Sequence, residues 1–209
     1  MKQNNTGLRN TRFLTELAVL TAIELILELS GLGYIHTKLL EFTIMQIPVI
    51  VGAIVLGPIG GLVLGSVFGL TSFWQCFGKS WFGATLLSIS PLGTFVTCVI
   101  PRVAMGLACA FLFRTLYGKR NKLFPKLSDR ASSLACCGIV GLSGALLNTI
   151  LFMGFLVAIF GKSDFLLNMG SSQIVPFVVG MVGVQGLIEA VICCVVSASI
   201  SHALLRARK

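Results

Sequence analysis

The sequence predicts an all-α integral membrane protein, a bundle of six transmembrane helices with both termini in the cytoplasm. Three observations indicate this fold class. Apolar residues make up 56% of the 209 positions and charged residues 11%, against about 25% charged in a typical soluble domain. Uncharged runs reach the length of a membrane span, and most Lys and Arg residues fall in a few short segments. A soluble globule of this size has too little interior to bury so much apolar surface.

The first half of the chain contains three apolar segments. A transmembrane helix needs about 20 apolar residues, and Phe13 to Leu32 supplies the first. The uncharged run from Phe42 to Gly78 is 37 residues long, which is too long for one span and short for two. Because proline lacks a backbone donor and disfavours helix at the residue before it, we expect the run to break at Gly57-Pro58.

The second half contains three longer segments. The run from Pro91 to Tyr117 contains a fourth span, and the uncharged run from Ala131 to Gly161 is long enough for a tilted fifth. Pro176 to Leu205, interrupted only by Glu189 and His202, gives a sixth. We therefore expect a single membrane domain over residues 1–209, with helices at 13–32, 43–56, 59–77, 93–117, 131–160 and 176–205.

The placement of Lys and Arg predicts the orientation. Six spans put both termini and the second and fourth loops on one side of the membrane, and that side holds twelve of the 16 basic residues. The opposite side holds Lys38, Lys79 and Lys162. Since cytoplasmic loops carry an excess of Lys and Arg, both termini should be cytoplasmic. The net charge of +9 therefore reports topology, and we expect no nucleic-acid partner.

Signatures of catalysis and metal binding are scarce. The chain has two histidines, His36 and His202, and neither HExxH nor GxSxG occurs. The seven cysteines form no CxxC pair, which favours a packing role over a metal site or disulfides. We expect a protein that is no enzyme and binds no cofactor or metal. Uphill transport would then draw its energy from a gradient or from a separate subunit.

Polar residues inside the predicted spans mark a candidate ligand pocket, because such residues are costly in lipid and are functional candidates by default. They concentrate toward the outer half of the bundle, as expected of a pocket open to the outside. In a structural alternative, Glu24, Glu28 or Glu189 pairs with Arg102 to lock the bundle, and Trp74 anchors at the membrane interface. The candidate substrate-binding residues are Arg102, Trp74, Gln75, Lys79, Asn148, Gln185 and Glu189.

Small residues form a second pattern. Glycines repeat every fourth residue from Gly57 to Gly69, and such ridges let helices approach closely in lipid. We expect this ridge to serve internal packing. Ala18 and Ala22 form a similar pair on the first helix, roughly 120° around it from the face that carries Glu24 and Glu28. One face of that helix is thus available to a pocket and another to a neighbour.

Several motifs resemble the substrate-binding (S) components of energy-coupling-factor (ECF) vitamin transporters. The first is AxxxA at Ala18 to Ala22, and the second is the run from Gln46 to Pro58, in which Gln46 stands where that family often has histidine. The segments Gly65–Ser72 and Pro101-Arg102 also match. The resemblance implies a six-helix protein of the bacterial plasma membrane that binds a vitamin from outside.

The resemblance also implies partners and a substrate class. An S component docks on a transmembrane coupling subunit that carries two cytoplasmic ATPases, and it topples in the membrane to release its substrate inward. Ala18 and Ala22 would contact the coupling subunit. Within the family the chain is most similar to pantothenate-type members and their close relatives.

Pantothenate fits part of the polar set. Arg102 or Lys79 would form an ion pair with its carboxylate. An arginine does this best, because its guanidinium binds both carboxylate oxygens in bidentate fashion. The amide and hydroxyl groups of pantothenate would meet the amide side chains at positions 75, 148 and 185. Glu189 argues the other way, because an acid beside an anion repels it unless the acid is paired with a base or protonated. Hydroxymethylpyrimidine, pyridoxine, riboflavin, folate, cobalamin and a queuosine precursor remain open as substrates.

Two other function classes compete with this interpretation. A stand-alone secondary transporter would use a proton gradient through Glu24, Glu28 or Glu189, but the two halves of the chain show no convincing inverted repeat. An intramembrane enzyme or assembly factor is disfavoured by the missing catalytic cluster.

Overall fold

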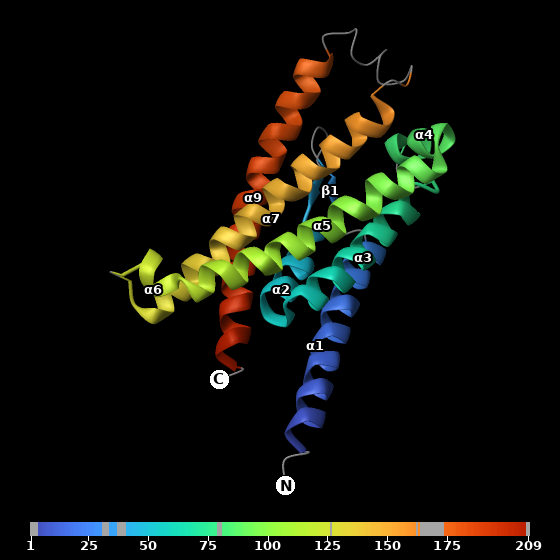
Figure 1. The fold of residues 1–209 in the computed structure, drawn as a ribbon. Coiled ribbons are helices and arrows are strands. Elements are labelled where there is room, and N and C mark those ends of the chain that lie inside the picture. Colours follow the sequence, from blue (N-terminus) through green and yellow to red (C-terminus); the bar gives the residue numbers. More distant parts are fainter. Residues whose placement is uncertain are drawn as a thin grey trace.

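The computed structural model describes residues 4–30, 34–36, 41–78, 81–125, 127–161, 163 and 174–207. Helices dominate this part of the chain (Figure 1). In chain order the helices are α1 (Asn4–Leu29), α2 (Gln46–Leu56), α3 (Pro58–Gln75), α4 (Trp81–Ile89), α5 (Pro91–Gly118), α6 (Arg120–Leu123), α7 (Asp129–Phe160) and α9 (Ile174–Ala207).

Three of these helices are long and apolar enough to cross a membrane, among the residues that the structure describes. They are α5, α7 and the part of α9 from Gly186 to Ala207. The helices α1, α2 and α3 overlap the segments expected at 13–32, 43–56 and 59–77, and α1 begins earlier, at Asn4. The short helices α4 and α6 were not expected from the sequence.

Two short antiparallel strands, which were not expected from the sequence either, lie between α1 and α2 along the chain. Strand β1 (Tyr34–His36) pairs with β2 (Glu41–Thr43), with Ile35 opposite Phe42. Each strand has three residues, so neither carries the alternating pattern that identifies a strand in a sequence.

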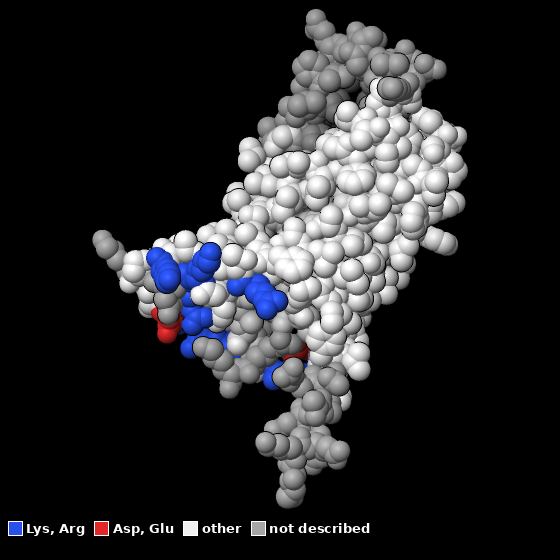
Figure 2. Space-filling view, viewed as in Figure 1, with Lys and Arg blue, Asp and Glu red and all other residues white. Residues whose placement is uncertain are grey.

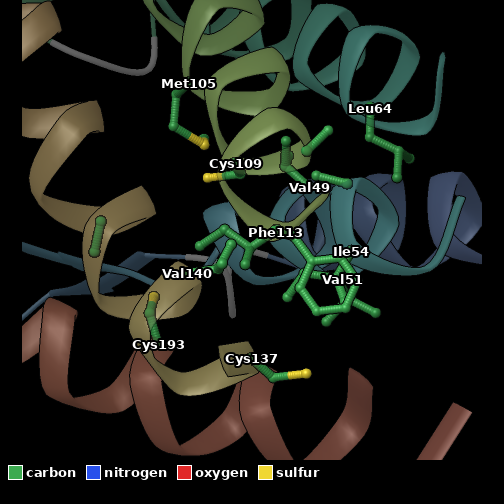
Figure 3. Close-up of a cluster of buried hydrophobic side chains, with 14 of the residues drawn as sticks. Val49, Val51, Ile54, Leu64, Met105, Cys109, Phe113, Cys137, Val140 and Cys193 are labelled. Atoms are coloured by element: carbon green, nitrogen blue, oxygen red, sulfur yellow. The ribbon is translucent and has the colours of Figure 1, made fainter. Parts of the chain in front are cut away.

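Helix α2 is the centre of the bundle. Its 11 residues span about 16 Å at 1.5 Å per residue, about half of the bilayer core. Nine of them are buried, and α1, α3, α5, α7 and α9 all contact the helix. Figure 3 shows Val49, Val51 and Ile54 of α2 facing side chains from α3, α5, α7 and α9. A helix that is apolar on every side is buried on every side, and α2 follows that rule.

The turn between α2 and α3 lies at Gly57-Pro58, where the sequence predicts the break. Helix α2 ends at Leu56, and Gly57 has a φ of 79°, a left-handed conformation that glycine adopts without a steric penalty. Pro58 then occupies the first position of α3, where its missing N–H removes no intrahelical hydrogen bond.

The glycine ridge of α3 packs against α5. A Cβ atom at Gly65 would lie 2.7 Å from the carbonyl oxygen of Arg102, and one at Gly69 would lie 2.7 Å from Cα of Val99. Gly61 likewise meets the backbone of Gly106. The expected packing role is confirmed at these three glycines, whereas Gly57 serves the turn and has open space around it.

The start of α1 and the end of α9 lie at the same end of the molecule (Figure 1). The guanidinium of Arg12 donates a hydrogen bond to the carbonyl of Ala207 over 3.1 Å, and it also pairs with Glu16 at 2.9 Å. Helix α6 lies toward this end as well. The segments that carry most of the basic residues are therefore gathered on one side of the bundle.

The cysteines behave as small apolar residues. All seven sulfurs are free, and six of the seven residues are buried. The sulfurs of Cys76 and Cys98 are 4.0 Å apart, twice the length of a disulfide bond. Their predicted packing role is confirmed.

Candidate functional site

Arg102 is held in the interior of α5 by the residue that precedes it. Pro101 has no N–H, so it cannot donate the helical hydrogen bond to the carbonyl of Thr97, four residues earlier. Nη1 of Arg102 donates to that same carbonyl over 3.0 Å. The proline thus exposes an acceptor, and the arginine side chain folds back along the helix to meet it. Arg102 is 8% exposed.

Two aromatic rings flank the Arg102 guanidinium. Its central carbon lies 4.4 Å from the ring centroid of Phe152 on α7 and 5.5 Å from that of Phe68 on α3. Both distances lie within the range of a cation–π interaction, which strengthens when water is excluded. The cation is therefore fixed between three helices in an apolar setting, where a planar guanidinium is well suited to grip a carboxylate.

The two glutamates of α1 share one face of the helix and are both buried. Gln75 of α3 donates to Oε1 of Glu28 over 2.6 Å. Glu24 is fully buried, and neither of its carboxylate oxygens has a hydrogen-bond partner among the described residues. Gln75, a predicted site residue, thus joins α3 to α1 at this polar face.

Glu189 of α9 binds the last residue of β2 and the first residue of α2. Its Oε1 accepts from the backbone N–H of Thr43 at 2.7 Å, and its Oε2 accepts from Nε2 of Gln46 at 3.5 Å. Both donors are neutral groups, so they hold the carboxylate in place without bringing a positive charge to it. The predicted conflict between Glu189 and an anionic substrate therefore stays a prediction.

Asn148 of α7 and Gln46 of α2 each carry a buried oxygen in need of a donor. Oδ1 of Asn148 and Oε1 of Gln46 have no hydrogen-bond partner among the described residues, as is true of Oε2 of Glu28. Leaving a buried polar atom unpaired costs roughly 1–3 kcal/mol. Acceptors of this kind are suited to a ligand that brings hydroxyl or amide N–H groups.

The other predicted site residues have different environments. Trp74 is 70% exposed and its ring lies 6.4 Å from that of Phe77, which favours an interface anchor over a pocket wall. Lys79 lies outside the described residues, as does the side chain of Gln185, although Gln185 belongs to α9. Their roles stay predictions.

Sequence reasoning missed two contributors to this region, Gln46 and Phe152. Gln46 is a fully buried polar residue at the head of the most apolar helix, and that contrast is a signal in the sequence. Phe152 follows Asn148 by four residues and so lies on the same face of α7. An aromatic residue one helical turn from an amide side chain in an apolar run was the signal in the sequence that could have identified Phe152.

Ala18 and Ala22 are exposed on α1. Large apolar neighbours on the same helix, among them Leu14 and Ile26, are also exposed. This side of α1 is therefore an apolar surface with small residues in it, available to lipid or to another membrane subunit.

Apolar helices long enough to cross a membrane, with buried polar side chains between them, are typical of a membrane protein that binds a polar ligand. The family model described as "ECF transporter, substrate-specific component" matches residues 12–201. The match covers most of the chain, and the chain belongs to this family. The protein is a transporter component rather than an enzyme.

A comparison with curated proteins finds a more specific similarity. Over 168 residues the chain is 25% identical to the pantothenate transporter PanT of Leuconostoc mesenteroides subsp. mesenteroides. The alignment covers 78% of this chain and 74% of that protein.

Proposed function

We propose that this protein is the pantothenate-binding subunit of an ECF importer. It captures the vitamin from the outer side of the bacterial plasma membrane, and both of its termini are cytoplasmic. Six helical segments form the bundle, with α2 as a short central member. The similarity to a pantothenate transporter supports the choice of substrate, and the buried guanidinium of Arg102 is the observation that carries it.

The buried polar groups match the chemistry of pantothenate. The vitamin has one carboxylate, which pairs with Arg102, and it has hydroxyl and amide N–H groups that act as donors. The oxygens of Asn148 and Gln46 accept those donors. The carboxylate and the donor groups of the ligand thus meet side chains of complementary character. Gln75, Lys79, Gln185 and Glu189 complete the proposed site or position its members.

The pairing at Arg102 is tested by isothermal titration of pantothenate into the purified protein. Arg102→Ala should weaken binding by at least tenfold, because a hydrogen-bonded charge pair contributes roughly 1.5–3 kcal/mol. Arg114→Ala is the matched control, since Arg114 lies exposed on the same helix and should bind pantothenate normally. Equal affinity of Arg102→Ala and the native protein would remove Arg102 from the site.

We further propose that the exposed face of α1 around Ala18 and Ala22 docks on a transmembrane coupling subunit that carries two ATPase subunits. Transport energy then comes from ATP hydrolysis by these partners. Small residues allow the close helix contact that such docking requires.

A gradient-driven transporter is the second candidate, and Glu24 is the observation that favours it. A buried carboxylate without a hydrogen-bond partner in the described part of the chain resembles the proton-carrying acids of secondary transporters. Uptake by liposomes separates the two functions. The ECF proposal requires the partner subunits and ATP, whereas uptake by this chain alone under a pH gradient, abolished in Glu24→Gln, would support the second candidate.

A further inference from the structure

A second polar region, whose lining does not include Arg102, lies at the end of the bundle where α1 begins and α9 ends. A cavity of about 420 Å³ opens there between the end of α5, the short helix α6, the start of α7 and the end of α9. Figure 2 shows that Lys and Arg side chains gather at this end, while the rest of the visible described surface is almost free of charge. The charged residues that line the cavity are Arg120, Asp129, Arg130 and Arg206.

The cavity carries excess positive charge. Three arginines and one aspartate give a net charge of two positive units. The ion pair found within 4.0 Å among the described residues joins Arg12 to Glu16. Asp129 forms no such ion pair with the three arginines in this part of the chain. Helix α7 also begins at Asp129, and the N-terminus of a helix adds partial positive charge.

Arg120 and His202 are each held in place by a neighbouring side chain, and each keeps one nitrogen without a hydrogen-bond partner in the described part of the chain. The guanidinium of Arg120 lies 4.2 Å from the ring centroid of Tyr117, which also lines the cavity. Nδ1 of His202 is 3.4 Å from Oγ of Ser133. Nε of Arg120 and Nε2 of His202 are buried and have no hydrogen-bond partner in the described part of the chain.

A purely topogenic role does not account for this arrangement. Charges that only fix orientation in the membrane need to be present in a loop, without a defined geometry. Here one arginine is stacked on an aromatic ring, a histidine is oriented by a hydroxyl group, and both lie at the wall of a cavity of ligand size.

We propose that this cavity binds a phosphate group. Guanidinium forks match the oxygens of a phosphate in bidentate fashion, and the net charge of the lining complements a phosphate dianion or a phosphodiester. The group has two available sources, the headgroup of an anionic phospholipid on this side of the membrane and a soluble phosphate. The site is separate from the vitamin pocket and does not depend on the identity of the vitamin.

The test measures the thermal stability of the purified protein with two probes. One is sodium phosphate, compared with sodium chloride at equal ionic strength. The other is dioleoyl phosphatidylglycerol in detergent micelles, compared with dioleoyl phosphatidylcholine. We expect each probe, at about ten times its Kd, to raise the Tm by about 3–6 °C. The double variant Arg130→Gln, Arg206→Gln should lose this rise, and both residues are exposed, so the variant should fold.

The matched control is the double variant Arg114→Gln, Lys122→Gln, which removes the same charge from exposed residues that do not line the cavity. It should keep the rise in Tm. Arg120→Lys, which retains the charge but loses the planar fork, should reduce the rise. A response to phosphatidylglycerol alone assigns the site to a lipid headgroup, and a response to sodium phosphate alone assigns it to a soluble ligand. No response to either probe, or equal responses in the cavity and control variants, would overturn the proposal.

Discussion

Pro101 and Arg102 show how one residue prepares the environment of the next. Proline in the interior of a helix ordinarily destabilises it by about 3 kcal/mol, through the lost hydrogen bond and a steric clash. In α5 the freed carbonyl of Thr97 becomes the acceptor for Arg102. The local defect therefore positions a buried cation, and we infer that stability is given up here for ligand recognition.

This pairing predicts opposite effects of one substitution on stability and on binding. Pro101→Ala restores an N–H that competes for the carbonyl of Thr97, so the free protein should melt at a higher temperature. Arg102 loses a share of this hydrogen bond, and pantothenate should bind several-fold more weakly. Melting curves and titrations of the same preparation measure both effects. Pantothenate affinity equal to that of the native protein would show that the hydrogen bond to Thr97 does not position Arg102.

Residues with strong local signals could be predicted from the sequence, and residues defined by distant contacts could not. Arg102, Glu24 and Glu28 stand out because ionisable groups are rare in apolar runs. Gln46 gains its meaning only from Glu189, which lies 143 positions away. The buried oxygens of these amides also depend on how the helices pack, which no single segment encodes.

At the scale of elements, the contact between α3 and α5 places Arg102. Gly65 meets the carbonyl of Arg102 itself, and Phe68 on the same helix flanks its guanidinium. Gly65 and Phe68 both belong to α3, whereas Arg102 belongs to α5. A larger separation of the two helices would therefore move the Phe68 ring away from the guanidinium. The glycine ridge is therefore part of the site's geometry as well as of the fold.

Gly65→Ala tests this coupling. The added methyl group would meet backbone atoms of α5, which cannot move as a side chain does, so the protein should lose roughly 1–3 kcal/mol of stability. We expect a lower Tm and weaker binding of pantothenate. Gly154→Ala on α7 is the control, because its methyl group enters open space and should leave the Tm unchanged or slightly raised. Identical melting of the two variants would contradict the packing account.

Some element boundaries are set by local sequence and could be predicted, whereas others depend on distant contacts and could not. The break at Gly57-Pro58 follows from the backbone preferences of two residues and was predictable. The pairing of β1 with β2 was not, because three-residue strands have no periodicity and Thr43 is fixed by Glu189 of α9. The short helix α6 likewise lies in a segment that the sequence identifies only by its charge.

At the scale of the whole molecule, one end of the bundle and its interior differ in character. Basic residues line a cavity at the end where the termini meet, whereas the interior of the bundle buries acids, amides and one arginine. The side of α1 that carries Ala18 and Ala22 is exposed and apolar. We infer that capture, energy coupling and lipid contact are separated over different parts of one small protein.

The docking face has a direct test. Ala18→Trp combined with Ala22→Trp should abolish co-purification of the ATPase subunits, because two large rings prevent close approach of a helix. Binding of pantothenate by the variant should be retained. Ala158→Trp, on an exposed alanine of α7, is the control and should still co-purify. Normal assembly and uptake by the double variant would exclude this face of α1 as the docking surface.

The most direct test of the central claim is the thermal stability of the purified protein in detergent, measured against a panel of vitamins. The panel includes pantothenate, hydroxymethylpyrimidine, pyridoxine, riboflavin, folate, cobalamin and a queuosine precursor. A ligand that binds only the native state raises the Tm by mass action, so a nanomolar ligand gives a clear shift at micromolar concentration. The account predicts a shift with pantothenate that Arg102→Ala removes. A shift with a different vitamin, or with none, would contradict it.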